Sequence, residues 1–101
     1  MFTFIELPSF EQIRERYLND EEFRVLQHFL LQNPKAGEVI PGSGGCRKLR
    51  WQAEGRGKRG GLRIIYFLRP AQDHIILVTL YGKNVRENIE PRTLRKLKEA
   101  F

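Results

Sequence analysis

The first residues of the chain have an apolar pattern that predicts a short strand followed by a helix. Residues 2–7 mix β-branched and aromatic side chains and stop at Pro8, which is typical of a strand at the edge of a sheet. Ser9 and Gln12 then match a capping box. The apolar residues after this start fall at helical spacing: Phe10, Ile13 and Tyr17. We therefore expect an amphipathic helix that begins at Ser9.

A second helix is predicted by a second capping box, formed by Asn19 and Glu22. Its apolar stripe consists of Phe23, Val25, Leu26, Phe29 and Leu30. The stripe ends before Asn33 and Pro34, because the residue before a proline disfavours helical geometry. Residues 34–45 are rich in glycine and proline, so we expect a loop there.

The second half of the chain predicts a three-stranded antiparallel meander. Leu49 and Trp51 alternate with basic residues, which indicates a half-exposed strand with these two side chains in the core. Residues 62–68 and 75–81 are apolar on both faces in their middles, as central strands are. Residues 70–73 can turn the chain between them.

Pro91 suits the first turn of a last helix. The apolar stripe of that helix is Leu94, Leu97 and Phe101. The expected fold class is therefore α+β, with a small antiparallel sheet made of an edge strand and the three-stranded meander. Two N-terminal helices pack against this sheet, and a short C-terminal helix follows. The chain has no internal repeat or linker, so we expect residues 1–101 to form one domain.

The composition indicates a globular protein of the cytoplasm. No apolar run reaches the roughly 18 residues of a membrane span, and the first residues lack the basic start and cleavage site of a signal peptide. We therefore expect no membrane partner. The single cysteine, Cys46, cannot form an internal disulfide, which agrees with a reducing compartment. We expect it to act as a small apolar residue.

Charge is segregated along the chain, whose formal net charge is +6. Residues 1–33 contain six acidic residues against three arginines. Residues 43–69 contain eight basic residues against Glu54, a net charge of +7. Such a concentrated basic region favours a polyanionic partner.

Three basic residues are expected to converge on one face of the meander. Lys48 and Arg50 share the outer face of one strand, and Arg63 opens the next strand, which should pair with it. Like charges clustered on a sheet repel one another, so a bound anion explains them better than stability does. The alternative is a solvated sheet face without a ligand.

The segment AEGRGKRGG, residues 53–61, has the composition of a phosphate-binding loop. Its glycines let the backbone approach a ligand, and its cations Arg56, Lys58 and Arg59 can meet phosphates. The alternative is a solvated hairpin connection. It is not a P-loop, because neither the glycine spacing nor the strand-to-helix context of that motif is present.

Metal and cofactor sites find no support in the sequence. His28 lies in a predicted helix and His74 at a predicted turn, without a third ligand at metal spacing. No serine lies in a nucleophile motif, and the acidic residues are far from the basic segment in sequence. We therefore expect neither a metal nor a cofactor, and any catalysis should depend on cations.

Residues 42–67, GSGGCRKLRWQAEGRGKRGGLRIIYF, together with LYGKN at residues 80–84, resemble the core signature of RelE/HigB-like bacterial toxins, particularly the HigB-type branch. The resemblance extends over nearly the whole chain as an order of elements. It implies a toxin of a type II toxin–antitoxin system that enters the ribosomal A site and cuts messenger RNA. It also implies a cognate antitoxin, of the helix-turn-helix type, that neutralises the toxin.

The resemblance also assigns the family's basic positions to residues of this chain. The paired strand positions fall on Lys48 and Arg50, the arginine opening the next strand on Arg63, and the lysine after the last strand on Lys83. Some members carry an arginine directly after that lysine, where this chain has Asn84 and offers Arg86 only nearby. Members with a catalytic C-terminal tyrosine have no clear match here, and the nearby tyrosines are Tyr66 and Tyr81.

RNA cleavage without a metal needs a proton acceptor, charge stabilisation at the phosphate and a proton for the leaving oxygen. We expect Lys48 to act as the base, because neighbouring cations favour its neutral form, and Arg50 and Arg63 to stabilise the phosphate. Lys83 would assist the leaving group. Residues expected to hold RNA are Arg47, Arg56, Lys58, Arg59 and Arg86. Three alternatives remain: a ParE-like toxin of DNA gyrase, a non-enzymatic RNA-binding module, and a basic structural protein.

Overall fold

The computed structural model describes residues 2–52, 61–83 and 89–101. The elements in chain order are β1 (Thr3–Glu6), α1 (Pro8–Glu11), α2 (Arg14–Tyr17), α3 (Asp20–Gln32), β2 (Glu38–Val39), β3 (Arg47–Trp51), β4 (Leu62–Arg69), the 3-10 helix η1 (Pro70–Gln72), β5 (His74–Gly82) and α4 (Pro91–Ala100).

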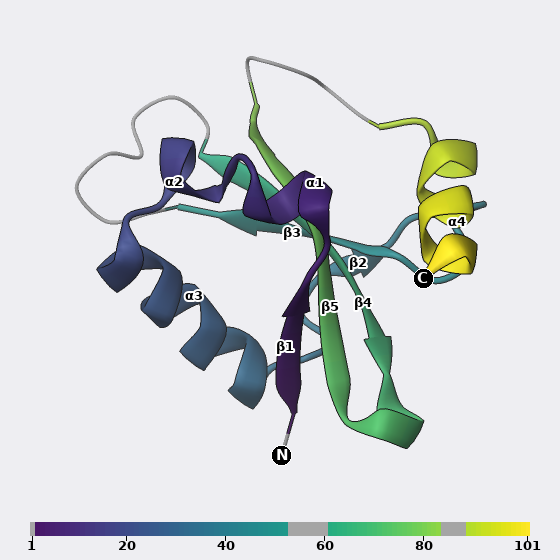
Figure 1. The fold of residues 1–101 in the computed structure, drawn as a ribbon, viewed down its shortest axis with the longest axis horizontal. Coiled ribbons are helices and arrows are strands. Elements are labelled where there is room, and N and C mark those ends of the chain that lie inside the picture. Colours follow the sequence, from purple (N-terminus) through teal and green to yellow (C-terminus); the bar gives the residue numbers. More distant parts are fainter. Residues whose placement is uncertain (1, 53–60, 84–88) are drawn as a thin grey trace.

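Across the described residues, the strands form one five-stranded sheet in the order β1-β5-β4-β3-β2. Helices α2 and α3 lie on one side of this sheet and α4 lies on the other (Figure 1). The fold is therefore α+β, as predicted, and the meander of β3, β4 and β5 is antiparallel throughout. The predicted turn between β4 and β5 is η1, followed by Asp73 in the left-handed region at φ 56°.

Two strands differ from the prediction of a purely antiparallel sheet. β1 pairs with β5 in parallel, with Thr3 opposite His74. Parallel neighbours need a long crossover connection, which the intervening helices and strands supply here. β2 lies within residues 34–45, where a loop was expected, and pairs with β3 through Glu38 and Val39. Both of its side chains are exposed, so β2 leaves no alternating pattern in the sequence.

The first predicted helix is in fact two short helices, and its predicted cap is wrong. α1 begins at Pro8, a residue that fits the first position of a helix, and Leu7 is its N-cap residue without a side-chain bond. Ser9 instead donates its hydroxyl hydrogen to the Val78 carbonyl on β5, which ties α1 to the sheet. The second capping box is confirmed, because Asn19 and Glu22 each accept the other's backbone N–H at 2.8 Å.

Two apolar clusters form the core, one on each face of the sheet. Leu26 and Leu30 of α3 pack with residues such as Ile64 and Leu77 on one face. Leu94 of α4 packs on the other face in a cluster that includes the buried residues Cys46, Ile65, Phe67 and Val78. Cys46 is thus a small core residue, as expected.

The structure confirms one of the two core predictions on β3 and corrects the other. Leu49 is buried, with 7% of its surface exposed. Trp51 is only half-buried and packs at the rim of the α3-side cluster, with its ring centroid 5.2 Å from that of Phe29. Trp51 is the last residue of β3, so it lies at the end of the strand and not in its middle.

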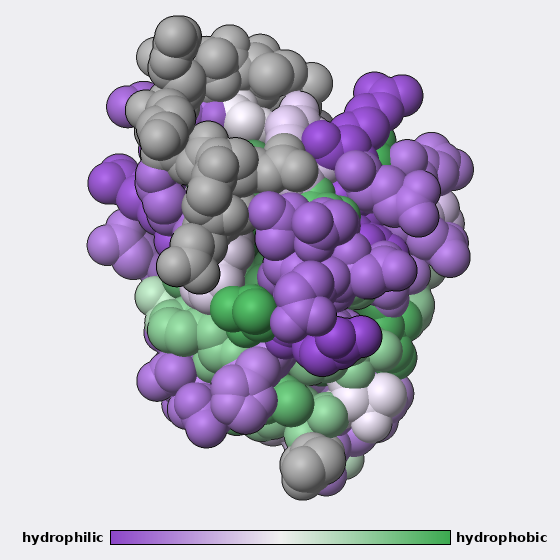
Figure 2. Space-filling model, turned by 90° about the vertical axis from the view of Figure 1, so that its left-hand side faces the viewer, coloured by the Kyte–Doolittle hydropathy of each residue, from purple (hydrophilic) through white to green (hydrophobic). Residues whose placement is uncertain are grey.

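Hydrophilic side chains cover much of the surface seen in Figure 2, the side on which α3 lies, with smaller apolar areas between them. This agrees with the amphipathic pattern of α3, whose buried residues all face the sheet cluster. No helix in residues 2–52, 61–83 and 89–101 is long and apolar enough to cross a membrane.

Candidate nucleic-acid interface

A row of three side chains crosses the sheet on the face that carries α4. Arg50 of β3 lies directly opposite Arg63 of β4, and Arg63 lies opposite Tyr81 of β5. Residues that face each other on neighbouring strands project to the same side of a sheet, so these three side chains share one face. Arg50 is exposed and Arg63 is half-buried, with a bond from its Nη1 to the Leu62 carbonyl at 3.2 Å. The pairing thus places two arginines side by side, near the end of β3 and the start of β4.

Lys48 lies on the same face, one row away from this pair. It is half-buried and sits opposite Ile65 on β4 and opposite Glu38 on β2. Lys48, Arg50 and Glu38 line one surface hollow together with Ala36 and Leu49. The structure therefore brings Lys48, Arg50 and Arg63 together, as the sequence predicted, and adds a carboxylate to the group.

Glu38 was not among the candidate residues in the sequence, because residues 34–45 look like a loop. A possible signal was the β-branched pair Val39 and Ile40 beside it, which can extend an edge strand. Its position opposite Lys48 follows only once β2 is known to pair with β3. A carboxylate there can accept a hydrogen bond or a proton beside the cations.

Lys83 lies just beyond the row, in the turn that follows β5. Its backbone N–H donates to the Gly61 carbonyl at 3.3 Å, which holds this turn against the start of β4. Gly82 lies opposite Leu62, so Lys83 is at the same end of the sheet as Arg63. The side chain is exposed.

Arg47, a predicted RNA-binding residue, lies on the opposite face of β3 from Lys48 and Arg50. It is half-buried, and its Nη1 donates to the carbonyls of Gly37 at 2.7 Å and Lys35 at 3.3 Å. These bonds hold the segment between α3 and β2. The structure thus separates Arg47 from the row that contains Arg50.

Tyr66 and Tyr81 have different environments. Tyr66 is fully buried, and its hydroxyl donates to the Pro34 carbonyl at 2.8 Å while accepting the Gly37 N–H at 2.9 Å. Burial raises the pKa of this phenol, and the bond from Gly37 and the charge of Arg47 only partly oppose that shift. Tyr66 is therefore a structural residue, whereas Tyr81 belongs to the row beside Arg63.

The predicted RNA-binding residues Arg56, Lys58, Arg59 and Arg86 lie outside the described residues. Of the residues that the structure describes, no group of three or more histidine, cysteine, aspartate or glutamate side chains is placed to hold a metal ion. Among the described residues of the row and of the hollow beside it, the reactive groups are the cations, the Glu38 carboxylate and the Tyr81 phenol.

Comparison with known proteins shows the family and the fold of this chain. Residues 35–101 match the family described as the RelE toxin of the RelE/RelB toxin–antitoxin system. The structure is similar to a solved structure of E. coli toxin RelE, a mutant with two arginines replaced by alanine, in the free state. That match has a TM-score of 0.60 and 12% sequence identity and covers 96% of each chain, so it shows a shared fold. The family match includes β3, β4, β5 and α4, and with them the row of Arg50, Arg63 and Tyr81. The chain therefore belongs to the RelE toxin family of toxin–antitoxin systems.

Proposed function

We propose that this chain is a cytoplasmic toxin of the HigB-type branch that cuts messenger RNA in the ribosomal A site. The observation that carries the proposal is the position of Arg50 directly opposite Arg63. Like charges in such a pair destabilise a sheet, so a ligand of opposite charge accounts for them better than folding does. A phosphodiester under attack gains negative charge, and two planar guanidinium groups can stabilise it through paired N–H bonds.

The proposed reaction uses the 2′-hydroxyl of the RNA as the nucleophile. The 2′-oxygen bonds to the neighbouring phosphorus and its proton passes to a base. The bond from phosphorus to the 5′-oxygen then breaks, and that oxygen takes up a proton. The products are a 2′,3′-cyclic phosphate and a 5′-hydroxyl end. Arg50 and Arg63 hold the phosphate oxygens in this scheme, and Lys83 protonates the leaving 5′-oxygen because it is exposed at the same end of the sheet.

Lys48 is the proposed proton acceptor because it lines the hollow beside Arg50. Glu38 shares that hollow and is a second candidate acceptor. A carboxylate and an unprotonated amine can each accept the proton of a hydroxyl group. Comparing Glu38→Gln with Lys48→Gln assigns the role. Replacing the true acceptor should lower the cleavage rate at every pH and remove the pH dependence that the acceptor causes. Replacing the other residue should leave the pH profile of cleavage unchanged.

The ribosome is proposed to supply alignment of the 2′-hydroxyl with the phosphorus, which accounts for much of the rate in intramolecular attack. Free RNA should therefore be a poor substrate. A cognate antitoxin, of the helix-turn-helix type, is proposed to cover the basic face and keep the toxin inactive.

The experiment is a map of cleaved messages in cells that express the protein, combined with cleavage of a defined message on programmed ribosomes. The proposal requires cuts inside translated regions, cyclic phosphate ends, and at least tenfold slower cleavage of the same RNA without ribosomes. Intact messages together with trapped DNA gyrase would establish the ParE-like alternative instead. RNA binding without cleavage or toxicity would establish a binding module.

A further inference from the structure

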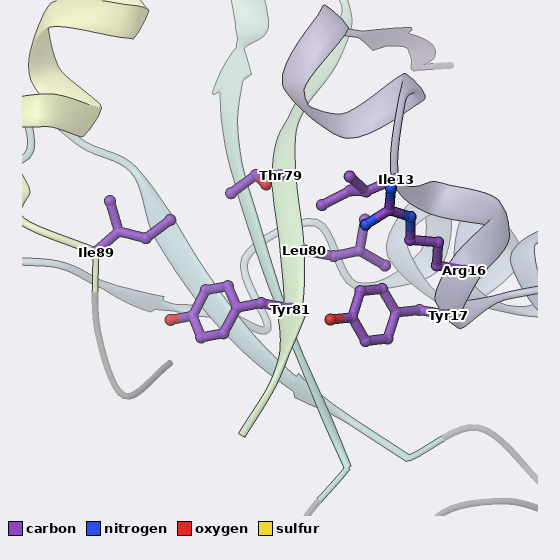
Figure 3. A pocket seen from close by; sticks show the side chains of 7 residues that line it. All are labelled: Ile13, Arg16, Tyr17, Thr79, Leu80, Tyr81 and Ile89. Atoms are coloured by element: carbon purple, nitrogen blue, oxygen red, sulfur yellow. The ribbon is translucent and has the colours of Figure 1, made fainter. Parts of the chain in front are cut away.

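The row that begins at Arg50 ends at a pocket on the far edge of β5 (Figure 3). The pocket has a volume of about 230 Å³. Its lining comes from the segment of α1 and α2, from β5 and from the position two residues before α4: Ile13, Arg16, Tyr17, Thr79, Leu80, Tyr81 and Ile89. Tyr81 is thus both the last member of the row and a wall of the pocket.

The pocket exists because β1 covers only the first half of β5. The last pair of that ladder is Glu6 with Leu77, after which the chain turns into α1. Ser9 fastens α1 to Val78, and α2 follows alongside the second half of β5. The side chains of α2 therefore face the strand edge at Thr79–Tyr81 where a strand would otherwise lie. In Figure 3 the hydroxyl of Tyr17 points toward β5.

The lining residues suit a flat aromatic ligand that is neutral or negatively charged. Tyr17 and Tyr81 supply phenol rings, Arg16 supplies an exposed guanidinium, and three aliphatic side chains supply apolar walls. None of the seven lining residues that the structure describes is acidic. Bases of single-stranded RNA are bound in this way, by stacking on tyrosine rings and on arginine planes beside their phosphates.

We propose that this pocket is the subsite for one RNA base next to the cleaved phosphate, and that it sets the nucleotide preference of cleavage. The inference rests on the proposed function, since it places the phosphate at Arg63. Neighbouring strands are about 4.8 Å apart, so the step from Arg63 on β4 to Tyr81 on β5 is within the reach of one nucleotide. Tyr17 stacks on the base, and Arg16 contacts the base plane or its phosphate.

The test compares Tyr17→Leu, Tyr17→Phe and Arg16→Gln with wild type on programmed ribosomes, using messages that differ in the nucleotides flanking the cut. Arg24→Gln is the matched control for Arg16, because Arg24 is an exposed cation of the neighbouring helix that pairs with Glu21. Tyr17→Leu should lower the cleavage rate of the preferred message by roughly 5- to 150-fold and flatten the preference, and Tyr17→Phe should keep both. Arg16→Gln should weaken cleavage more than Arg24→Gln does.

A second measurement separates this inference from the proposed function. The fluorescence of 2-aminopurine in a short RNA should be quenched when wild type or Tyr17→Phe binds the RNA, and should not be quenched by Tyr17→Leu. Quenching by a wild-type protein that cuts no message would overturn the proposed function and the pocket's part in cleavage, and would leave the pocket as a binding site for an RNA base. Unchanged rates, preferences and quenching in folded Tyr17→Leu and Arg16→Gln would overturn the subsite alone. Loss of antitoxin binding with unchanged cleavage would also overturn it, because the pocket would then hold a peptide.

Discussion

Arg50 lies directly opposite Arg63 in the antiparallel pair of β3 and β4. On one face of a sheet the Cβ atoms of such a pair are about 5 Å apart, which brings two like charges near each other. A phosphate between them would remove that repulsion. Two neighbouring cations favour an anionic ligand, and mutations in the pair should affect activity and stability differently.

Replacing Arg63 should remove cleavage without unfolding the protein. Losing one charge contact to a transition state costs on the order of 3 kcal/mol, about a hundredfold or more in rate. Arg63→Ala should keep its thermal midpoint because it also relieves repulsion with Arg50. Arg63→Lys should recover only part of the rate, since an ammonium lacks the planar fork of donors. Cleavage on programmed ribosomes and thermal unfolding are measured in parallel, and near-wild-type cleavage by a stable Arg63→Ala protein would contradict the assignment.

Arg47 and Arg50 lie on opposite faces of β3, so a substitution of one is the control for a substitution of the other. Arg47→Ala should lower the free energy of unfolding by about 1 kcal/mol, because the carbonyls of Lys35 and Gly37 lose a charged donor. It should leave RNA affinity nearly unchanged. Arg50→Ala should do the reverse, with normal stability and weaker, less salt-dependent RNA binding. Urea unfolding and RNA titrations at two salt concentrations check both variants. If the two variants changed stability and RNA affinity equally, the different roles of the two faces of β3 would be contradicted.

Leu49 and Trp51 should differ in their contribution to stability. Leu49→Ala removes a buried side chain and should lower the free energy of unfolding by about 2–5 kcal/mol. Trp51→Ala should lower the free energy of unfolding by less, since Trp51 is only half-buried at the rim of the cluster, where its ring contacts Phe29. Urea unfolding of both variants measures which substitution lowers the free energy of unfolding more. A greater loss for Trp51→Ala would mean that the rim of this cluster is more completely covered than the described residues indicate.

Tyr66 should make stability depend on alkaline pH. Its pKa is raised in the folded state, chiefly by burial, so the folded protein holds the phenol proton more tightly than the unfolded chain does. The associated stability is fully present below about pH 10 and is lost as the pH rises through the folded-state pKa. Tyr66→Phe lacks this loss, but it should cost about 1–3 kcal/mol near pH 7 because the Gly37 N–H and the Pro34 carbonyl lose their partner. Thermal unfolding from about pH 7 to 11 compares the two proteins, and parallel curves would contradict the role of Tyr66.

An antitoxin that covers the basic face should bind less tightly as salt increases, because its acidic groups compete with solution anions for the same cations. Co-purified complex should lose affinity between low and physiological ionic strength, and Arg50→Ala should reduce that dependence. Affinity that is independent of salt would show an apolar interface elsewhere on the toxin.

The meander and α3 could be predicted because local patterns determine them. The alternation around Leu49 and the capping box of Asn19 and Glu22 each depend on neighbours within a few residues. The pairing of Arg50 with Arg63 could be anticipated for the same reason, since one hairpin joins their strands. The parallel placement of β1 could not, because it depends on β5 some seventy residues later. Glu38 and the Tyr17 pocket were missed because short exposed strands and strand-edge hollows arise from tertiary packing and leave no periodic signal.

The parallel ladder between β1 and β5 also determines when this toxin can become active during its own synthesis. Thr3 finds its partner only when His74 has been made, and Arg63 gains Tyr81 beside it later still. Contacts this distant in sequence form late and slowly. A chain that stops before β5 holds the basic residues of β3 and β4 but lacks the strand that joins the N-terminal segment to them. Interrupted translation before β5 should therefore release fragments without this arrangement, and Arg63 gains Tyr81 beside it only once β5 has been made.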